Sequence, residues 1–126
     1  MGQSTLTRYA MPGNILVVHV ADTSPETVED WYLSSLAEME TYTGPVKRLY
    51  DMRDLRTVSI EAVRTAVKVR RHPKAHLVFT AVLTSNSTVA ALVRAALAVQ
   101  GDGNFKLFTS EPEAVNWLLA KVPENS

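Results

Sequence analysis

The sequence predicts an α/β fold with a mainly parallel five-stranded sheet, an antiparallel N-terminal edge strand and four helices. Apolar segments of strand length alternate with segments of helical periodicity, an order that implies parallel pairing through right-handed crossovers. The first two strand candidates are separated only by a Pro-Gly turn, which favours an antiparallel hairpin. With 126 residues, of which 46% are hydrophobic and 21% charged, residues 1–126 are expected to form one domain.

The predicted hairpin occupies the N-terminal twenty residues. Its strands are residues 4–10 and residues 15–20, the second of which reads ILVVHV and is β-branched and apolar. Residues 11–14, MPGN, form the turn, in which Gly13 supplies a positive φ.

A helix is predicted to follow this hairpin. Thr23 and Glu26 form its expected capping box, Pro25 suits its first turn, and Gly44-Pro45 ends it. Its apolar residues recur at helical spacing: Val28, Trp31, Tyr32, Leu36, Met39 and Tyr42.

The next unit is a strand over residues 46–51, VKRLYD, and a helix over residues 59–71 with Ser59 as its cap. We expect the buried stripe of this helix to contain Ile60, Val63 and Val67.

Two further strand and helix pairs complete the chain. Residues 76–84, HLVFTAVLT, are apolar on both faces and predict a central strand, after which Ser87 caps a helix. Residues 105–109 form the last strand, and Ser110 opens the last helix. That helix is lined by Ala114, Trp117, Leu118 and Val122.

Composition excludes several function classes. Thirteen basic residues balance thirteen acidic ones, so no broad nucleic-acid surface is expected. The absence of Cys excludes disulfides and cysteine-ligated zinc. No apolar run has the length of a signal peptide or a membrane span, so we expect a cytoplasmic protein without integral membrane association.

The carboxyl ends of the predicted strands carry most of the polar candidates. Ligands of such sheets favour this edge, where each strand also leads into a helix N-terminus. The candidate ligand-binding or partner-binding residues are therefore Asp51, Arg53, Asp54, Ser59, Ser85 and Asn86. The alternative interpretation is that these residues are caps and turns, because caps require the same residue types.

Catalytic and metal sites are disfavoured. A phosphoacceptor receiver site could use Asp51 and Thr84, but it needs a carboxylate cluster for Mg²⁺ that the sequence lacks. His72 and His76 do not share a helical face, because Pro73 lies between them. We therefore expect no catalytic residue, no metal and no cofactor.

The helix over residues 88–100 is a candidate interface, either for a homodimer or for a foreign partner. Its outer face is rich in alanine, with Arg94 as its charge and Leu97 as an apolar protrusion. The alternative is that a neighbouring helix of the same chain buries this face.

Two segments, RLYDMRDL over residues 48–55 and FTSEPEAVNWLL over residues 108–119, together with the element order, resemble the SpoIIAA-like, or STAS/Sec14-like, proteins. The resemblance implies a small βα superhelix and a protein-binding switch of the anti-sigma-factor antagonist type. Such switches are phosphorylated on serine in an Asp-Ser-Ser-Gly motif, but here Ile60 or Glu61 takes the serine position.

The better match is the uncharacterised branch of that family. The resemblance therefore implies a non-enzymatic interaction or regulatory module without the usual phosphorylatable serine. The alternative function is binding of a small molecule or lipid in a pocket among the helices.

Overall fold

The computed structural model describes residues 4–98 and 104–122, with the side chains of residues 96–98 excepted. Five strands form one sheet in the order β1-β2-β3-β4-β5. The β1–β2 pair is antiparallel and the other three pairs are parallel, as predicted. The strands are β1 (Thr7–Met11), β2 (Ile15–His19), β3 (Val46–Asp51), β4 (Val78–Leu83) and β5 (Phe105–Phe108).

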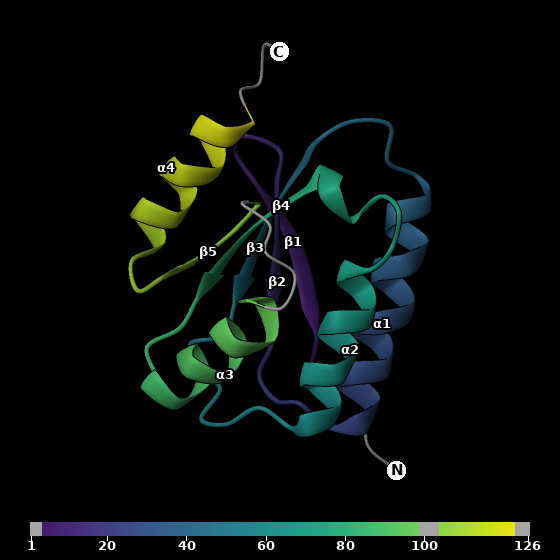
Figure 1. Cartoon of the computed structure of the whole chain (residues 1–126). Coiled ribbons are helices and arrows are strands. Elements are labelled where there is room, and N and C mark those ends of the chain that lie inside the picture. The colour runs from purple at the N-terminus through teal and green to yellow at the C-terminus, as the bar shows by residue number, and fades with distance from the viewer. Residues whose placement is uncertain (1–3, 99–103, 123–126) are drawn as a thin grey trace.

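Four helices are found in the described part of the chain. They are α1 (Pro25–Glu40), α2 (Ile60–Arg70), α3 (Ser87–Ala98) and α4 (Glu111–Lys121), with a 3₁₀ turn, η1 (Ala75–Leu77), before β4. Figure 1 shows α4 on one side of the sheet, and α1 and α2 side by side on the other, with α3 next to α2. None of these helices, over the residues described, combines the length and the apolar character needed to cross a membrane.

Side chains of β3 alternate between the two faces of the sheet, as strand geometry requires. Leu49 packs in the cluster under α4, whereas Tyr50 packs in the cluster under α1, α2 and α3. Arg48 and Tyr50 therefore share the three-helix face, and Leu49 and Asp51 share the α4 face.

The cores of the two faces draw on different elements. Under α4 the buried residues are Ile15, Val17, Leu49, Ala81, Leu83, Ala114 and Leu118. On the opposite face they are Leu6, Val18, Val20, Tyr50, Leu55, Val82 and Val89, and a further cluster of Met39, Val69, Ala75 and Val78 joins α1, α2 and η1 to β4.

The hairpin turn has the expected backbone, since Gly13 has φ 93° and Asn14 has φ 59°. The predicted strand over residues 4–10 begins three residues too early. Residues before Thr7 are held by α1 instead, because the Thr5 amide donates to Thr27 Oγ1 at 3.0 Å.

Two helix caps differ from the prediction by one residue. Ser24, not Thr23, caps α1, because its hydroxyl accepts from the Thr27 amide at 3.3 Å. Asn86, not Ser87, caps α3, since its amide oxygen accepts from two backbone N–H groups of the first turn. Ser59 and Ser110 are confirmed as the caps of α2 and α4.

The buried face of α2 also differs from the prediction. Ile60 is 69% exposed, and Val69 is the buried residue of this helix. The inward face begins with Ala62, and Ile60 lies two residues earlier, about 200° around the helix. The expected stripe was therefore wrong at its first residue.

Candidate functional site

The end of β3 places a paired carboxylate at the carboxyl edge of the sheet. Asp51 is 9% exposed, and both of its oxygens accept hydrogen bonds from Arg53. The Arg53 Nε and Nη2 atoms lie 2.9 and 2.8 Å from those oxygens, and the Arg53 amide adds a bond of 3.1 Å. The hydrogen bond from the Arg53 side chain lowers the pKa of Asp51 against the opposing effect of burial. This forked geometry keeps Asp51 ionised.

Three more residues complete a charged group that we call the edge cluster: His19, Asp51, Arg53, Asp54 and Glu111. The Glu111 carboxylate, in the first turn of α4, lies 3.2 Å from Arg53 Nη2. His19 Nε2 lies 2.7 Å from Asp54 Oδ2, and His19 is the β2 residue paired in register with Asp51.

Three members of the edge cluster are exposed as well as internally bonded. The Asp54 side chain is 64% exposed, and the Arg53 and Glu111 side chains are 44% and 43% exposed. The sequence identified the three members at the end of β3, Asp51, Arg53 and Asp54, but neither His19 nor Glu111. For His19 the available signal was its place at the carboxyl end of β2.

Two of the other candidate residues at this end of the sheet, Ser59 and Asn86, have local structural roles. The Ser59 hydroxyl accepts from the Ala62 amide at 3.1 Å, and the Ser59 amide donates to Thr23 Oγ1 at 3.1 Å. Asn86 caps α3 through its side-chain oxygen, and the neighbouring Ser85 is exposed. The capping interpretation therefore applies to Ser59 and Asn86.

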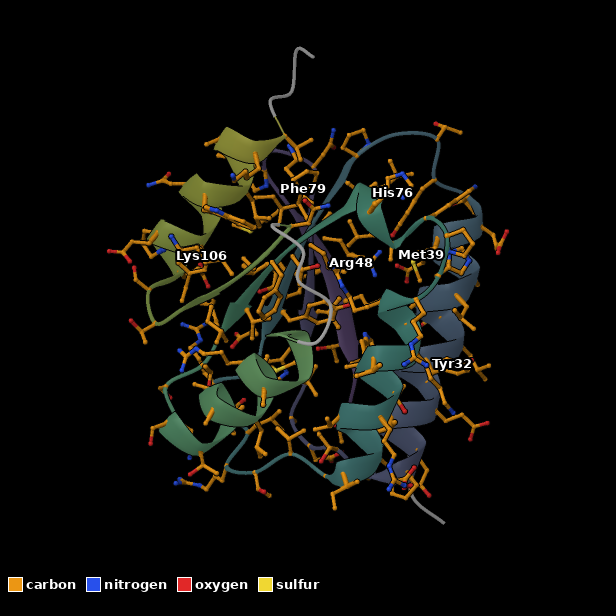
Figure 2. All side chains as sticks on the ribbon, in the orientation of Figure 1. Tyr32, Met39, Arg48, His76, Phe79 and Lys106 are labelled. Atoms are coloured by element: carbon orange, nitrogen blue, oxygen red, sulfur yellow. The ribbon has the colours of Figure 1, made fainter. Side chains whose placement is uncertain are left out.

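A cavity of about 130 Å³ lies between the sheet and helices α1, α2 and α3. Its wall is mostly aliphatic and aromatic, with contributions from Val20, Val63, Ala66 and Val82. Arg48, which is 4% exposed, also lines it. Figure 2 shows the Arg48 side chain in the space between the sheet and α1, near Met39.

The Arg48 guanidinium is bonded through both of its terminal nitrogens. Its Nη2 atom donates to Glu38 Oε2 at 2.6 Å and to the Tyr42 hydroxyl, and Nη1 lies 3.5 Å from the Tyr50 hydroxyl. The Nε atom is buried and has no hydrogen-bond partner among the described residues. Burial acts to lower the pKa of Arg48, but Tyr50 and Glu38 raise it above its ordinary value, so the group stays charged.

No protein-family model matches the chain, and no curated protein matches it. Several solved structures do match the chain. An uncharacterised DUF3478-family protein with a SpoIIAA-like fold from Shewanella loihica matches with a TM-score of 0.67 at 18% identity, over 94% of this chain and 95% of that one. A serine-to-glutamate variant of RsbS from Moorella thermoacetica matches with a TM-score of 0.67 at 15% identity, over 94% and 100%.

An anti-sigma factor antagonist from Mycobacterium paratuberculosis matches with a TM-score of 0.60 at 13% identity, over 90% of this chain and 94% of that one. The chain has a SpoIIAA-like fold. The resemblance found in the sequence is thereby confirmed at the level of the fold. In this SpoIIAA-like fold the segment RLYDMRDL supplies both Arg48 of the cavity and the β3 end of the edge cluster.

The candidate interface on α3 is described in part. Arg94 is exposed, together with Ala91 and Ala95, while Val89 on the opposite side is fully buried. The Leu97 side chain lies outside the described residues.

Metal ligation has no grouping of side chains to support it within residues 4–98 and 104–122. No three His, Asp or Glu residues in these segments are gathered closely enough to hold an ion.

Proposed function

We propose that this chain is a non-enzymatic, regulatory protein-interaction module of STAS-like type that acts in the cytoplasm and binds a partner through the edge cluster. The observation that carries the proposal is the edge cluster itself. The charged side chains of Arg53, Asp54 and Glu111 are exposed, yet ion pairs hold them in place, so little ordering is needed when a partner binds. Complementary charge on a partner would give specificity.

The similar structures give this proposal its functional direction. One is a variant of RsbS and another is named as an anti-sigma factor antagonist, and both matches extend over at least 90% of the two chains. The absence of an enzyme activity is supported by Asp51, the most buried carboxylate of the edge cluster. Because Arg53 occupies both of its oxygens, Asp51 is poorly suited to accept a proton or attack a substrate.

Regulation in this chain is proposed to work without a phosphoserine switch at the start of α2. Ile60 and Glu61 take the place of the phosphorylatable serine, and the Ser59 hydroxyl already caps the helix. Incubation with cell extract and ATP, followed by mass spectrometry, should leave Ser59 unmodified. Stoichiometric phosphate on Ser59 would contradict this part of the proposal.

The partner surface is tested by affinity capture from an extract of the source organism with the immobilised wild type, Arg53→Glu and Arg64→Glu. Arg64 is the matched control, because its exposed side chain pairs with Glu61 on α2, outside the edge cluster. We expect one specific partner that the wild type and Arg64→Glu retain and Arg53→Glu loses. Equal retention by all three proteins would move the binding surface elsewhere, and specific retention by none would remove the interaction function.

A homodimer through α3 is a separate proposal. The exposed face that carries Arg94 and small residues would allow close approach of a second copy, and twofold pairs are the commonest soluble assemblies. Sedimentation at tens of micromolar should give a dimer for the wild type and a monomer for Leu97→Glu. Two monomers would leave a foreign partner as the remaining occupant of this face.

The cavity favours a second candidate function, binding of a small molecule. An apolar pocket with a few convergent polar groups is the usual form of a ligand site, and this one contains a buried charged donor. Protection of the chain against thermal unfolding by a compound that fits the cavity would support this function.

A further inference from the structure

We infer that the cavity binds a small carboxylic acid whose apolar body is about the size of one aromatic ring, with its carboxylate bonded to Arg48. The inference rests on the second candidate function, small-molecule binding, and adds the chemical class and size of the ligand. Three features of the cavity carry it: its volume, its unpaired donor and the charges in its wall.

The volume limits the body of the ligand. In proteins, an apolar cavity of about 150 Å³ accommodates benzene, and the cavity here has about 130 Å³. The side chains of Val20, Val63 and Val82 and the small side chain of Ala66 line it from the sheet and from α2. A ring or a short branched chain fills such a space, whereas a long acyl chain exceeds it.

The Arg48 Nε–H is the group that lacks a partner. Arg48 is 4% exposed and lines the cavity, and its Nε atom is fully buried without an acceptor among the described residues. The terminal nitrogens of the guanidinium are engaged by Glu38, Tyr42 and Tyr50, and Nε is the remaining donor. Because a buried N–H without an acceptor is unfavourable, a ligand oxygen at this position would be stabilising.

The charges in the wall favour an anionic oxygen. The lining residues include two arginines, Arg48 and Arg70, and one acid, Asp22. The Asp22 carboxylate is already engaged, since its Oδ1 atom accepts from the Ser24 amide at 3.0 Å and from Thr27 Oγ1 at 2.9 Å. A cation would face the Arg48 guanidinium, whereas a carboxylate gains a charge-assisted bond in a site of low dielectric.

The experiment compares four probes on the wild-type chain: benzoate, toluene, benzylamine and palmitate. Binding is measured by calorimetry, and the site is located by amide chemical-shift changes at Arg48, Val63 and Ala66. The first three probes share one ring and differ in charge, so their ranking isolates the carboxylate. We expect benzoate to bind about ten-fold or more tightly than toluene and benzylamine, and palmitate not to bind in the cavity.

Three variants locate the contact. Arg48→Gln should remove the preference for benzoate over toluene and leave toluene binding. Ala66→Phe should fill the cavity and abolish the binding of both. Arg64→Gln removes one positive charge at an exposed position of the same helix as Ala66 and should change neither affinity. If Arg48→Gln does not fold, the ranking of the probes on the wild type still decides the inference.

The outcomes separate this inference from the function on which it rests. Toluene binding without benzoate binding would keep the small-molecule function and overturn the carboxylate. Palmitate binding in the cavity would overturn the size and indicate a lipid. Failure of all four probes at millimolar concentration would overturn both the inference and the small-molecule function. Unchanged benzoate preference in a folded Arg48→Gln would overturn the role of Arg48.

Discussion

On one face of the sheet a single helix closes the core, and on the other face three helices surround a cavity. Helix α4 packs directly on β3, β4 and β5, and Leu49, Leu83 and Leu118 beneath it are at most 1% exposed. On the opposite face α1 and α2 pack chiefly against each other, and about 130 Å³ remains between them and the strands.

The difference follows from the residues that β3 directs to each side. Leu49 lets α4 approach closely, whereas Arg48 and Tyr50 are long side chains whose polar ends need partners away from the sheet. Those partners come from α1, through Glu38 to Arg48 and through Trp31 to Tyr50. The polar ends of Arg48 and Tyr50 thus hold α1 at a distance from the sheet, and the volume beneath the helices stays unfilled. A helix layer can therefore cover a face of the sheet without packing closely on it.

The largest expected effect is the loss of a side chain from the closed face. Leu118→Ala should lower the free energy of unfolding by about 3–5 kcal/mol, because Leu118 is fully buried and surrounded by protein atoms. The matched variant Leu55→Ala truncates the same residue type at the cavity, where Leu55 is 3% exposed. A wall residue has fewer neighbouring atoms to lose, so its loss should be smaller, by about 1 kcal/mol or more.

Urea denaturation of the wild type and the two leucine variants gives these values. Equal losses for Leu118→Ala and Leu55→Ala would mean that the two faces are packed equally well, and the contrast between them would not hold.

Adding side-chain volume should stabilise the chain at the cavity and destabilise it under α4. Ala66→Leu in α2 points new methyl groups at the cavity and should raise the free energy of unfolding by about 0.5–1 kcal/mol. Ala114→Leu in α4 makes the same change where Ala114 is fully buried under close packing, and it should lower that energy by about 1–3 kcal/mol. Changes of the same sign would show that the cavity does not distinguish the faces.

Much of this architecture could be predicted from local sequence signals. The strand over residues 46–51 was placed correctly, because it follows the Gly44-Pro45 helix end and its apolar pair, Leu49 and Tyr50, runs into a charged exit. Ser59 was identified as the cap of α2 because its residue type and its position before the helix are enough to specify that role. The hairpin turn was predicted because glycine, here Gly13, readily adopts the positive φ that such a turn requires.

The features that could not be predicted from the sequence depend on the distances between helices and strands. The Arg53–Glu111 pair joins residues 58 positions apart, and only the finished sheet brings β3 and α4 to the same edge. The cavity has no signature in any single segment, since it arises from how far α1 and α2 lie from β3. The exposure of Ile60 likewise depends on how α2 is rotated against its neighbours.

A smaller effect is expected where β3 ends on the α4 side. Both carboxylate oxygens of Asp51 accept hydrogen bonds from one partner, Arg53. Asp51→Asn should therefore lower the free energy of unfolding at neutral pH by about 1–2 kcal/mol. The partly exposed Arg53 keeps the value in this low range.

The pH dependence of the Asp51 effect has a defined sign. The pKa of Asp51 is lowered in the folded chain from its ordinary value of 3.8. Its stabilising contribution is therefore complete above pH 3.8 and is lost as the pH falls through the lower folded value. Urea denaturation of wild type and Asp51→Asn should show a gap that is constant near neutrality and closes in acid, whereas a gap that widens in acid would contradict the pairing.

The smallest effect is expected at the exposed end of the edge cluster. Asp54 bonds His19 at 2.7 Å, yet its side chain is 64% exposed, so water and salt compete for both groups. Asp54→Asn should change the free energy of unfolding by less than about 0.5 kcal/mol, well below the change for Asp51→Asn. Both variants remove one negative charge within four residues of each other, so comparing them at low and high salt separates burial from charge. If Asp54→Asn were as destabilising as Asp51→Asn, the solvent side of the edge cluster would support the sheet as strongly as the Asp51–Arg53 pair. Its assignment as a surface left for a partner would then lose its basis.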